Sequence, residues 1–238
     1  MSILEPADAV AIIPARGGSK RIERKNIKPF AGKPIIAYSI EAARKSGLFS
    51  RILISTDDPE IASIGAIYGS EAPFWRPDNL ADDQTPTAPV LIHALTWLAE
   101  RHHHPRYFCC IYATAPFLNP DDIQAGFHRL QETDALSVFS VTTFAFPIFR
   151  ALQIEKDGRV SMIWPEHALT RSQDLPEAYH DAGQFYWGHT ERFLAEQSLL
   201  SSDSYPLTIP RSRVVDIDTP EDWEIAERLF KALKPSST

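Results

Sequence analysis

The chain lacks the features that mark an extracellular or membrane protein. It has two cysteines in 238 residues, and these are adjacent, at Cys109 and Cys110. Adjacent cysteines in an apolar segment are poorly placed for a mutual disulfide and too few for a zinc site, so both are predicted to be core residues. No apolar run approaches the roughly 20 residues that cross a bilayer, and no signal segment opens the chain. We therefore expect no membrane partner and a cytoplasmic location.

A net positive charge is also missing. The formal net charge is -7 at pH 7, which argues against a nucleic-acid partner because such proteins present a net basic face. Hydrophobic residues at 44% and charged residues at 23% are typical of a globular protein, so extensive disorder is not expected. At this length we expect one α/β domain, residues 1–238, that carries an insertion.

Basic side chains are nevertheless concentrated in one loop near the N-terminus. The apolar run from Ala9 to Ile13 predicts a buried strand, Pro14 ends it, and a loop with Gly17 and Gly18 follows. Five cations lie in this loop: Arg16, Lys20, Arg21, Arg24 and Lys25. Small residues let backbone N–H groups approach a polyphosphate, although charge alone fits a solvated basic loop as well. The loop is neither a Walker loop nor a dinucleotide fingerprint, since it has no Gly-Lys-Ser/Thr before a helix and no G-x-G-x-x-G.

Strands and helices are predicted to alternate along the chain up to residue 142. The predicted strands are 9–13, 51–55, 107–112 and 135–142, and the predicted helices are 33–46, a segment closed by Gly69, 88–101 and 120–131. This alternation predicts a doubly wound, mainly parallel sheet.

The second predicted helix has a clear apolar stripe and an acidic start. Ile61, Ile64 and Ile67 are expected to face the core. Asp57 or Asp58 could touch a metal or a substrate, but an aspartate before a proline at a helix start is typical of an N-cap. Capping is therefore the preferred interpretation.

Residues 74–87 contain two prolines and little periodicity, which predicts an ordered loop. A long loop in a compact α/β domain is more often functional than idle. For Arg76 in this loop, a surface ion pair with Asp78 or Asp82 is the alternative to a ligand contact.

The alternation breaks between residues 143 and 182. This stretch contains Phe146-Pro147, a strand-like segment from Leu152 to Ile154, a turn at Asp157-Gly158 and an apolar run from Val160 to Trp164. It predicts a β-rich arm inserted into the domain. Exposed aromatic residues on a hairpin need cover, and a second subunit is the simplest cover, so we expect a homodimer.

Two further pairs of residues suit a ligand site. Asp216 and Asp218 lie two positions apart on an extended segment, so their carboxylates face the same side. Two hard oxygen ligands near a triphosphate suit Mg²⁺, although Asp218 could merely cap the helix that follows. Tyr112 and Thr114 follow the carboxyl end of a predicted strand, where open α/β sheets bind ligands.

The segment from Ile13 to Lys20, followed by Lys25-Asn26 and Gly32-Lys33-Pro34, resembles the N-terminal signature of the CMP-sugar synthetases. These are the cytidylyltransferases that activate nine-carbon keto-sugar acids. Further segments follow in the order of the family, at residues 76–87, 112–117, 171–187 and 214–222. The resemblance implies the Rossmann-like fold of the nucleotide-diphospho-sugar transferases, CTP as a substrate, Mg²⁺ or Mn²⁺ as a cofactor, and a homodimer paired through the inserted arm.

The resemblance also implies roles for individual residues. Those implied to bind CTP are Ala15, Arg16, Gly17, Ser19, Lys20, Lys25, Asn26, Arg76, Thr85 and Thr87. Those implied to act in catalysis are Arg16, Lys25, Asp216 and Asp218, the last two as metal ligands. Those implied to bind the sugar are Tyr112, Thr114, Arg171, Tyr179, His180 and Gln184. No side chain is assignable as a general base.

Some positions depart from the members that activate sialic acid. Tyr112 stands where those members have a glutamine, His180 stands where they often have an arginine, and Ala182-Gly183-Gln184 replaces Asn-Gly-Ala. A structural hydrogen bond is the alternative role for His180. These departures resemble the pseudaminic acid cytidylyltransferases, so we expect transfer of CMP from CTP to the anomeric hydroxyl of pseudaminic acid with release of pyrophosphate. A sialic, legionaminic or octulosonic acid acceptor and a non-catalytic nucleotide-binding module are the alternatives.

Overall fold

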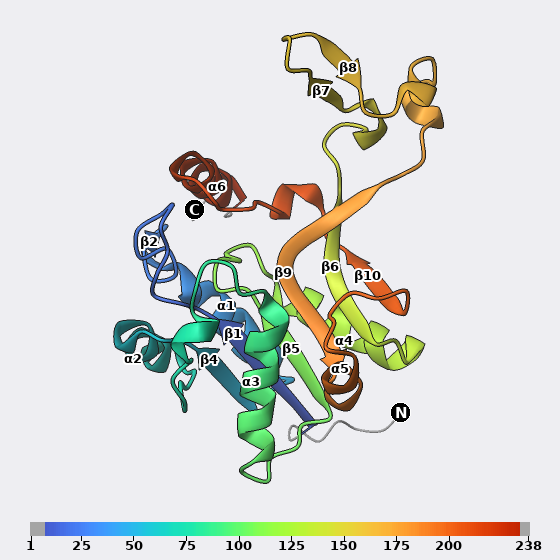
Figure 1. Cartoon of the computed structure of the whole chain (residues 1–238). Helices are drawn as coiled ribbons and strands as arrows, with labels where there is room; N and C mark the ends of the chain where they lie inside the picture. The colour runs from blue at the N-terminus through green and yellow to red at the C-terminus, as the bar shows by residue number, and fades with distance from the viewer. Residues whose placement is uncertain (1–7, 234–238) are drawn as a thin grey trace.

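The computed structural model describes residues 8–233, which fold around one central sheet. Its strands are β1 (Ala9–Pro14), β4 (Arg51–Ser55), β5 (Tyr107–Ile111), β6 (Ser137–Thr143), β9 (Tyr179–His189) and β10 (Ser204–Thr208). They lie in the order β10-β6-β9-β5-β1-β4, and all run parallel except β9, which pairs antiparallel with β5 and β6. The predicted mainly parallel sheet is therefore confirmed, with one reversed strand inside it (Figure 1).

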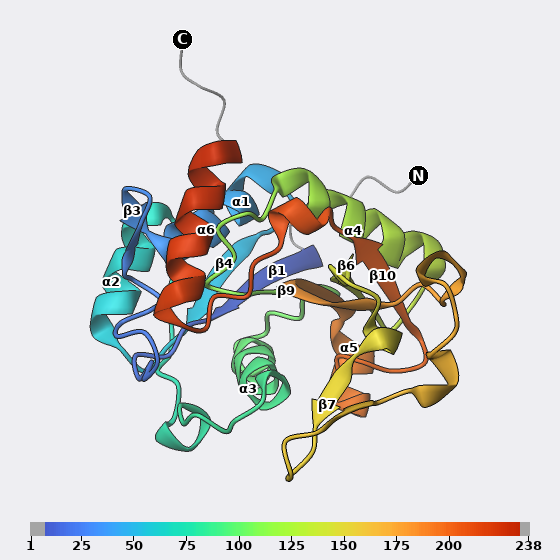
Figure 2. The same cartoon turned by 90° about the horizontal axis from the view of Figure 1, so that it is seen from above.

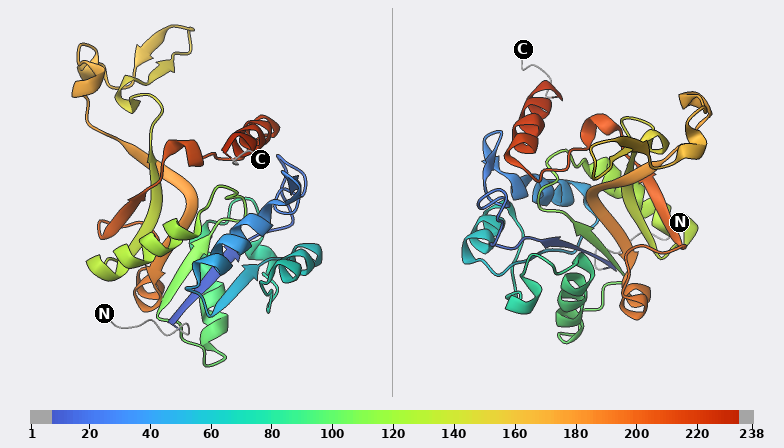
Figure 3. Two further views of the ribbon diagram at one scale, coloured as in Figure 1. Left: turned by 180° about the vertical axis from the view of Figure 1, so that it is seen from behind. Right: turned by 45° about the horizontal axis from the view of Figure 1, so that its top comes forward.

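Helices cover both faces of this sheet. They are α1 (Ile35–Ser46), α2 (Pro59–Tyr68), α3 (Thr87–Ala99), α4 (Pro120–Thr133), α5 (Thr190–Glu196) and α6 (Pro220–Leu233). α1 and α4 pack on one face with α2 beside α1, whereas α3 and α5 cover the other face (Figure 2 and Figure 3). Ile13 of β1 joins the core under α1, and its neighbour Ile12 joins the core under α3. Because side chains alternate along a strand, a sheet covered on both faces needs a continuous apolar run such as β1.

The predicted caps of α2 are confirmed, but the prediction that Ile67 faces the core is wrong. The Asp58 carboxylate accepts hydrogen bonds from the backbone N–H groups of Glu60 (2.8 Å) and Ile61 (3.2 Å), as an N-cap does. Ile67 is 78% exposed. The buried stripe of α2 runs through Ile61 and Gly65, one helical turn apart, and a Cβ on Gly65 would lie 2.1 Å from the Ile54 side chain of the sheet. The helix therefore meets the sheet at Gly65, and this turns Ile67 outward.

A third cluster of buried residues joins the segment that follows the basic loop to the last described helix. After the basic loop, β2 (Pro29–Phe30) and β3 (Lys33–Pro34) form a small hairpin against α6. Phe30 packs edge-on against Trp223 with ring centroids 5.5 Å apart, and the backbone N–H of Ala31 donates to Glu227 Oε1 at 2.9 Å. This packing brings the segment just before α6, which carries Asp216 and Asp218, next to the N-terminal basic loop.

The predicted arm leaves the sheet between β6 and β9. Its strands β7 (Leu152–Ile154) and β8 (Val160–Met162) form an antiparallel pair that projects away from the sheet in Figure 1. Ile154 is 79% exposed and Val160 is 60% exposed. Short 3₁₀ helices complete the connections of the chain: η2 (Asp78–Leu80), η3 (Ile148–Arg150), η4 (Pro165–His167), η5 (Ser172–Asp174) and η6 (Arg211–Arg213). Within residues 8–233 no helix is both long and apolar enough to span a bilayer.

Candidate active site

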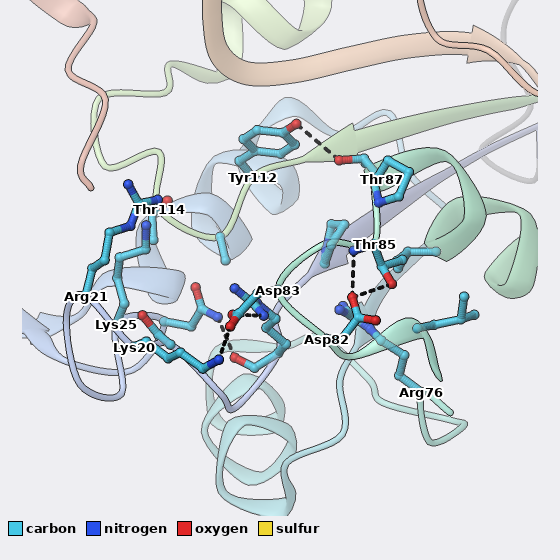
Figure 4. A pocket seen from close by; sticks show the side chains of 18 residues that line it. Lys20, Arg21, Lys25, Arg76, Asp82, Asp83, Thr85, Thr87, Tyr112 and Thr114 are labelled. Carbon is cyan, nitrogen blue, oxygen red and sulfur yellow. Dashed lines mark hydrogen bonds and ion pairs between the residues drawn. The ribbon is translucent and has the colours of Figure 1, made fainter. Parts of the chain in front are cut away.

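A cleft of about 520 Å³ opens where β1 and β5 end (Figure 4). Its lining residues come from the segments 14–26, 76–90 and 112–114. β1 and β5 are neighbouring parallel strands, so their carboxyl ends meet at the same edge of the sheet. Open α/β sheets bind their ligands at such an edge.

The basic loop is held in place by hydrogen bonds from both sides. The Asn26 side chain donates from Nδ2 to the backbone oxygen of Arg16 at 2.8 Å, and the backbone N–H of Gly17 donates to Asp57 Oδ1 at 2.8 Å. A Cβ at position 17 would lie 2.6 Å from the carboxylate of Asp58, so only glycine fits there. Asp58 therefore caps the helix, as the capping interpretation predicted, whereas Asp57 anchors the loop, which was not predicted.

The cations of this loop point in two directions. Arg24 turns to α2, where it pairs with Asp58 at 2.6 Å and Glu60 at 2.5 Å. The other cations, which all line the cleft, are Arg16, Lys20, Arg21 and Lys25. The structure thus separates one cation with a structural role from four that could contact a ligand.

Asp83 occupies the space between two of the cleft cations. Its carboxylate forms ion pairs with Arg16 and Lys20, and Figure 4 shows it beside Lys20. The hydrogen bonds from Lys20 and Arg16 hold the pKa of Asp83 below its usual value. An anionic group thus already lies where the basic loop was predicted to hold phosphate. Asp83 was not predicted to lie in the site, because nothing local in the sequence pairs this loop position with Arg16.

The two aspartates before α6 border the same group of cations. Asp218 pairs with Arg21 at 2.8 Å and with Lys25 at 3.4 Å, and the Lys25 ammonium also donates to the backbone oxygen of Ile217 at 2.7 Å. Burial and the negative charge of Asp218 raise the pKa of Asp216. Asp216 and Asp218 are therefore close enough to repel each other, and a divalent cation would relieve that repulsion.

This pair of carboxylates fits Mg²⁺ bound together with phosphate. Among residues 8–233, no three His, Cys, Asp or Glu side chains form a group that could hold a metal ion. Mg²⁺ does not need one, because it commonly takes one or two carboxylates and completes its shell with water and substrate phosphate. Asp218 is not needed as a helix cap. The Thr219 hydroxyl accepts a hydrogen bond from the backbone N–H of Asp222 at 3.2 Å. The Asp222 carboxylate accepts one from the backbone N–H of Thr219 at 2.7 Å, so the two residues form a capping box.

Arg76 is a buried cation at the wall of the cleft. Its side chain is 5% exposed, and its guanidinium donates to Ser55 Oγ at 3.1 Å and to the Ser55 backbone oxygen. Burial lowers the pKa of Arg76 to about 10. The alternative of a surface ion pair with Asp78 or Asp82 is wrong, because the side chain lies inside the protein.

The threonines of loop 74–87 differ in what they contact. The hydroxyl and the backbone N–H of Thr85 both donate to Asp82 at 2.7 Å, which closes the turn before α3. Thr87 begins α3 and its hydroxyl lies 3.2 Å from that of Tyr112 across the cleft wall. Thr85, Thr87, Tyr112 and Thr114 all line the cleft, as predicted for ligand contacts.

Comparison with known proteins places this chain in a family. A family model described as Cytidylyltransferase matches residues 10–233. The chain belongs to the cytidylyltransferase family. It is 43% identical over 222 residues to a pseudaminic acid cytidylyltransferase of Campylobacter jejuni, a match that covers 93% of this chain and 96% of the relative. A CMP-N,N'-diacetyllegionaminic acid synthase of Legionella pneumophila is 30% identical over 229 residues, covering 93% of this chain and 96% of the relative.

A solved structure of a CMP:2-keto-3-deoxy-manno-octonic acid synthetase complexed with CTP shares the fold of this cytidylyltransferase. The match has a TM-score of 0.69 at 17% identity and covers 94% of this chain and 98% of the other. At that identity the likeness supports the Rossmann-like architecture. The family and fold predicted from the sequence motifs are therefore confirmed.

Most of the predicted nucleotide contacts of the cytidylyltransferase lie together. The cleft is lined by these residues of that set: Arg16, Ser19, Lys20, Lys25, Asn26, Arg76, Thr85 and Thr87. Ala15 and Gly17 are not among the lining residues; the Ala15 N–H donates to the Ser55 backbone oxygen at 2.9 Å, and the Gly17 N–H donates to Asp57 Oδ1 at 2.8 Å. Asp216 and Asp218 lie beside the cleft next to Arg21 and Lys25, outside its immediate lining.

The residues predicted to bind the sugar do not all lie together in the cleft. Tyr112 and Thr114 line the cleft, whereas Gln184 is buried on β9 and donates from Nε2 to the backbone oxygen of Arg213 at 2.6 Å. His180 Nδ1 lies 2.8 Å from the backbone oxygen of Asp181, which corresponds to its predicted structural alternative. Tyr179 begins β9 and is 45% exposed.

Arg171 lies on the arm, apart from the segments that line the cleft. It pairs with Asp174 at 2.6 Å, and its side chain is 72% exposed. In the cytidylyltransferase, Arg171 therefore does not join the residues that line the cleft.

Proposed function

We propose that the protein transfers CMP from CTP to the anomeric hydroxyl of a nine-carbon α-keto acid sugar, with release of pyrophosphate. Pseudaminic acid is the preferred acceptor. The observation that carries this proposal is the 43% identity to a pseudaminic acid cytidylyltransferase along 93% of the chain. The cationic cleft at the strand ends supports it, because it suits a triphosphate. CTP is a cytoplasmic metabolite, so we place the reaction in the cytoplasm.

The basic loop would bind the β- and γ-phosphates of CTP. Arg16 and Lys20 already hold one carboxylate, that of Asp83, and a triphosphate offers them more negative charge. Cations fixed at this position would stabilise the charge that develops on the departing pyrophosphate. The amide of Asn26 holds the backbone at Arg16, so its role would be to keep the loop in the binding geometry.

Asp216 and Asp218 would hold Mg²⁺, or Mn²⁺ in its place. A divalent cation there would neutralise phosphate charge and lower the pKa of the attacking hydroxyl. Lys25 donates to the backbone of Ile217 between the two aspartates, so it would fix this segment relative to the phosphate loop. Tyr112 and Thr114 would position the acceptor sugar, which gains reactivity when it is held in line with the α-phosphorus.

The proposal includes a homodimer formed through the arm. Exposed apolar side chains on the β7–β8 hairpin, among them Ile154 and Val160, would be covered by a second subunit. Arg171 on the same arm would then be able to reach the cleft of the partner, which would account for its distance from the cleft of its own subunit.

Pyrophosphate release with CTP and Mg²⁺ tests the proposed function. Pseudaminic, legionaminic and N-acetylneuraminic acids would be compared at equal concentration. We expect release with pseudaminic acid at a kcat/KM well above that of the other two. A preference for either of the others would contradict the acceptor assignment, and release with none of them would contradict the reaction.

A further inference from the structure

The segment between η6 and α6, which carries Asp216 and Asp218, has few hydrogen bonds of its own. It runs from the end of η6 at Arg213 to the start of α6 at Pro220. In the part of the chain that the structure describes, the backbone groups of residues 215–218 form no hydrogen bond with another backbone group. Helices and sheets are held in place by such bonds. The position of this segment therefore depends on bonds from the side chains of neighbouring elements.

The end of the segment next to α6 is attached at Ile217. The Ile217 side chain is 2% exposed and belongs to the buried cluster that contains Phe30 and Trp223. Its backbone oxygen accepts a hydrogen bond from Lys25 Nζ at 2.7 Å. These contacts hold Ile217 against the basic loop. Asp216 lies on the other side of Ile217, where the segment leads back to η6.

The end of the segment next to η6 is attached at Arg213. Its guanidinium forms two hydrogen bonds with the carboxylate of Asp122 in the first turn of α4: Nη2 donates to Oδ1 at 3.1 Å, and Nη1 donates to Oδ2. The Arg213 side chain is 26% exposed and that of Asp122 is 16% exposed. An arginine bound through two nitrogens to one carboxylate is fixed in orientation as well as in distance. Arg213 is therefore held against α4.

Gln184 attaches the same residue to the central sheet. The Gln184 side chain is 3% exposed and donates from Nε2 to the backbone oxygen of Arg213 at 2.6 Å. The backbone oxygen of Gln184 accepts the N–H of Tyr112 at 2.9 Å, and Tyr112 lines the cleft. Gln184 thus joins the edge of the cleft to the segment that carries the two aspartates.

We propose that Arg213 and its two partners, Asp122 and Gln184, are positioning residues of the metal site. They hold Asp216 where it can share a divalent cation with Asp218. Three chain steps of at most about 3.6 Å each lead from Arg213 to Asp216, so the position of Arg213 limits where the Asp216 carboxylate can lie. Mg²⁺ demands a near-ideal octahedral geometry, and a displaced carboxylate binds it less well. This proposal rests on the proposed function, because it names the residues that support the metal site of the same reaction.

Three variants and one matched control test the attachment. Asp122→Asn keeps the shape of the side chain and removes the charge that pairs with Arg213. Gln184→Met has a similar length and removes the donor to the Arg213 backbone. Asp122→Glu keeps a carboxylate and should restore part of any loss. Glu71→Gln is the control, because Glu71 accepts two hydrogen bonds from Arg51, at 2.6 and 2.9 Å, at the start of β4, whereas the cleft lies at the carboxyl ends of the strands.

The mobility of the segment in the free protein tests the attachment without metal or turnover. We expect the backbone ¹⁵N order parameters of residues 214–217 to be near the rigid value of about 0.85 in the wild type. They should fall below about 0.6 in Asp122→Asn and in Gln184→Met, with the Tm of each variant confirming that it folds. Glu71→Gln should keep the wild-type values. Order parameters that stay at the wild-type values in both variants overturn the positioning role.

The effect of Mn²⁺ on CTP binding tests the link to the metal site. Calorimetry gives the Kd for CTP in EDTA and in saturating Mn²⁺, and the ratio of the two measures how much the metal tightens binding. We expect this ratio to fall about tenfold in Asp122→Asn and Gln184→Met, as is usual when the support of a metal ligand is lost, and to stay unchanged in Glu71→Gln. The Kd in EDTA should change less than about twofold, because the cations of the basic loop remain.

The outcomes separate this proposal from the proposed function. Increased mobility of the segment with an unchanged effect of Mn²⁺ overturns its link to the metal site. A wild type whose CTP binding is not tightened by Mn²⁺ overturns the metal site and this proposal together. A wild type that releases no pyrophosphate with any of the three sugars refutes the proposed function, whereas the order parameters and the effect of Mn²⁺ still decide the role of Arg213 and its partners.

Discussion

Asp83 forms an ion pair with Arg16 across the mouth of the cleft, and both side chains are about one third exposed, at 35% and 30%. Lys20 contacts the same carboxylate. Arg16 and Lys20 are the cations that we propose to bind the triphosphate. CTP would therefore compete with Asp83 for these two cations.

Asp83→Asn is expected to tighten CTP binding. The substitution removes the competing charge and keeps the size of the side chain. The gain should be modest, at most about fivefold in Kd, because exposed ion pairs contribute little in water. Isothermal titration of CTP into both proteins measures it, and higher salt should narrow the difference. Weaker binding in Asp83→Asn would mean that Asp83 assists the nucleotide instead of competing with it.

Asp216→Asn is expected to abolish turnover that depends on Mg²⁺ while leaving the fold intact. The amide keeps the shape of the side chain but removes a charged oxygen ligand. Turnover would be followed against Mg²⁺ concentration, and Tm would be measured by calorimetry. Glu221→Gln is a suitable control. Glu221 is exposed in the first turn of α6, and this substitution also removes one negative charge near Asp216. A fully active Asp216→Asn protein would exclude Asp216 from the metal site.

The raised pKa of Asp216 predicts a pH dependence. A raised pKa means that Asp216 takes up a proton at a higher pH than an ordinary aspartate, and a protonated carboxyl does not bind a cation. Activity should therefore begin to fall on acidification above the usual aspartate range. Because the metal competes with the proton, a tenfold higher Mg²⁺ concentration should move this acid limb to lower pH. Profiles of kcat/KM against pH at two Mg²⁺ concentrations that coincide would contradict the assignment.

Asp58→Ala is expected to lower the free energy of unfolding by about 1–2 kcal/mol, the usual range for an N-cap. For a chain of this size that corresponds to a fall in Tm of roughly 2–8 °C. Glu60→Ala is the control, because Glu60 contacts the same arginine but is 64% exposed, so little change is expected.

The contribution of Asp58 also depends on pH. Burial alone would raise its pKa, but hydrogen bonds from the Ile61 N–H and the Arg24 guanidinium outweigh burial and hold it below the usual value. A depressed pKa in the folded state stabilises the protein above the unfolded pKa, and the stabilisation is lost as pH falls through the folded value. The difference in stability between wild type and Asp58→Ala should therefore shrink on acidification below about pH 4. An equal difference at pH 7 and pH 3 would contradict this account.

The exposed apolar residues of the arm predict that the protein is a dimer in solution. Sedimentation should give a species near twice the chain mass of 26.7 kDa. Ile154→Asp places a charge on the exposed apolar face of the hairpin and should shift the protein to a monomer. Lys156→Asp, close by at the turn, adds a negative charge outside that face and should leave the dimer in place. A wild-type monomer would remove the arm as an interface.

Much of the candidate site could be predicted from local sequence. The basic loop with its glycines, the polar residues after β5 and the aspartates before α6 each lie within a short segment, and the structure places them around one edge of the sheet. What could not be predicted is which cations face the cleft. Arg24 and Lys25 are neighbours in sequence, yet Arg24 turns to Asp58 and Lys25 to Asp218. Only the packing of α2 and α6 on either side of the loop decides between them.

By itself, the sequence determined the alternation of strands and helices, the family and the chemistry of the cleft, because hydrophobic periodicity, turn residues and motifs are local properties. β4 was predicted with the bounds Arg51–Ser55 that the structure has. Only the tertiary structure decided that β9 runs antiparallel between β5 and β6, that Ile67 is exposed, and that Asp83 pairs with Arg16, which is distant in sequence. Strand pairing and ion pairs depend on which surfaces pack together, and no local pattern of residues carries that information.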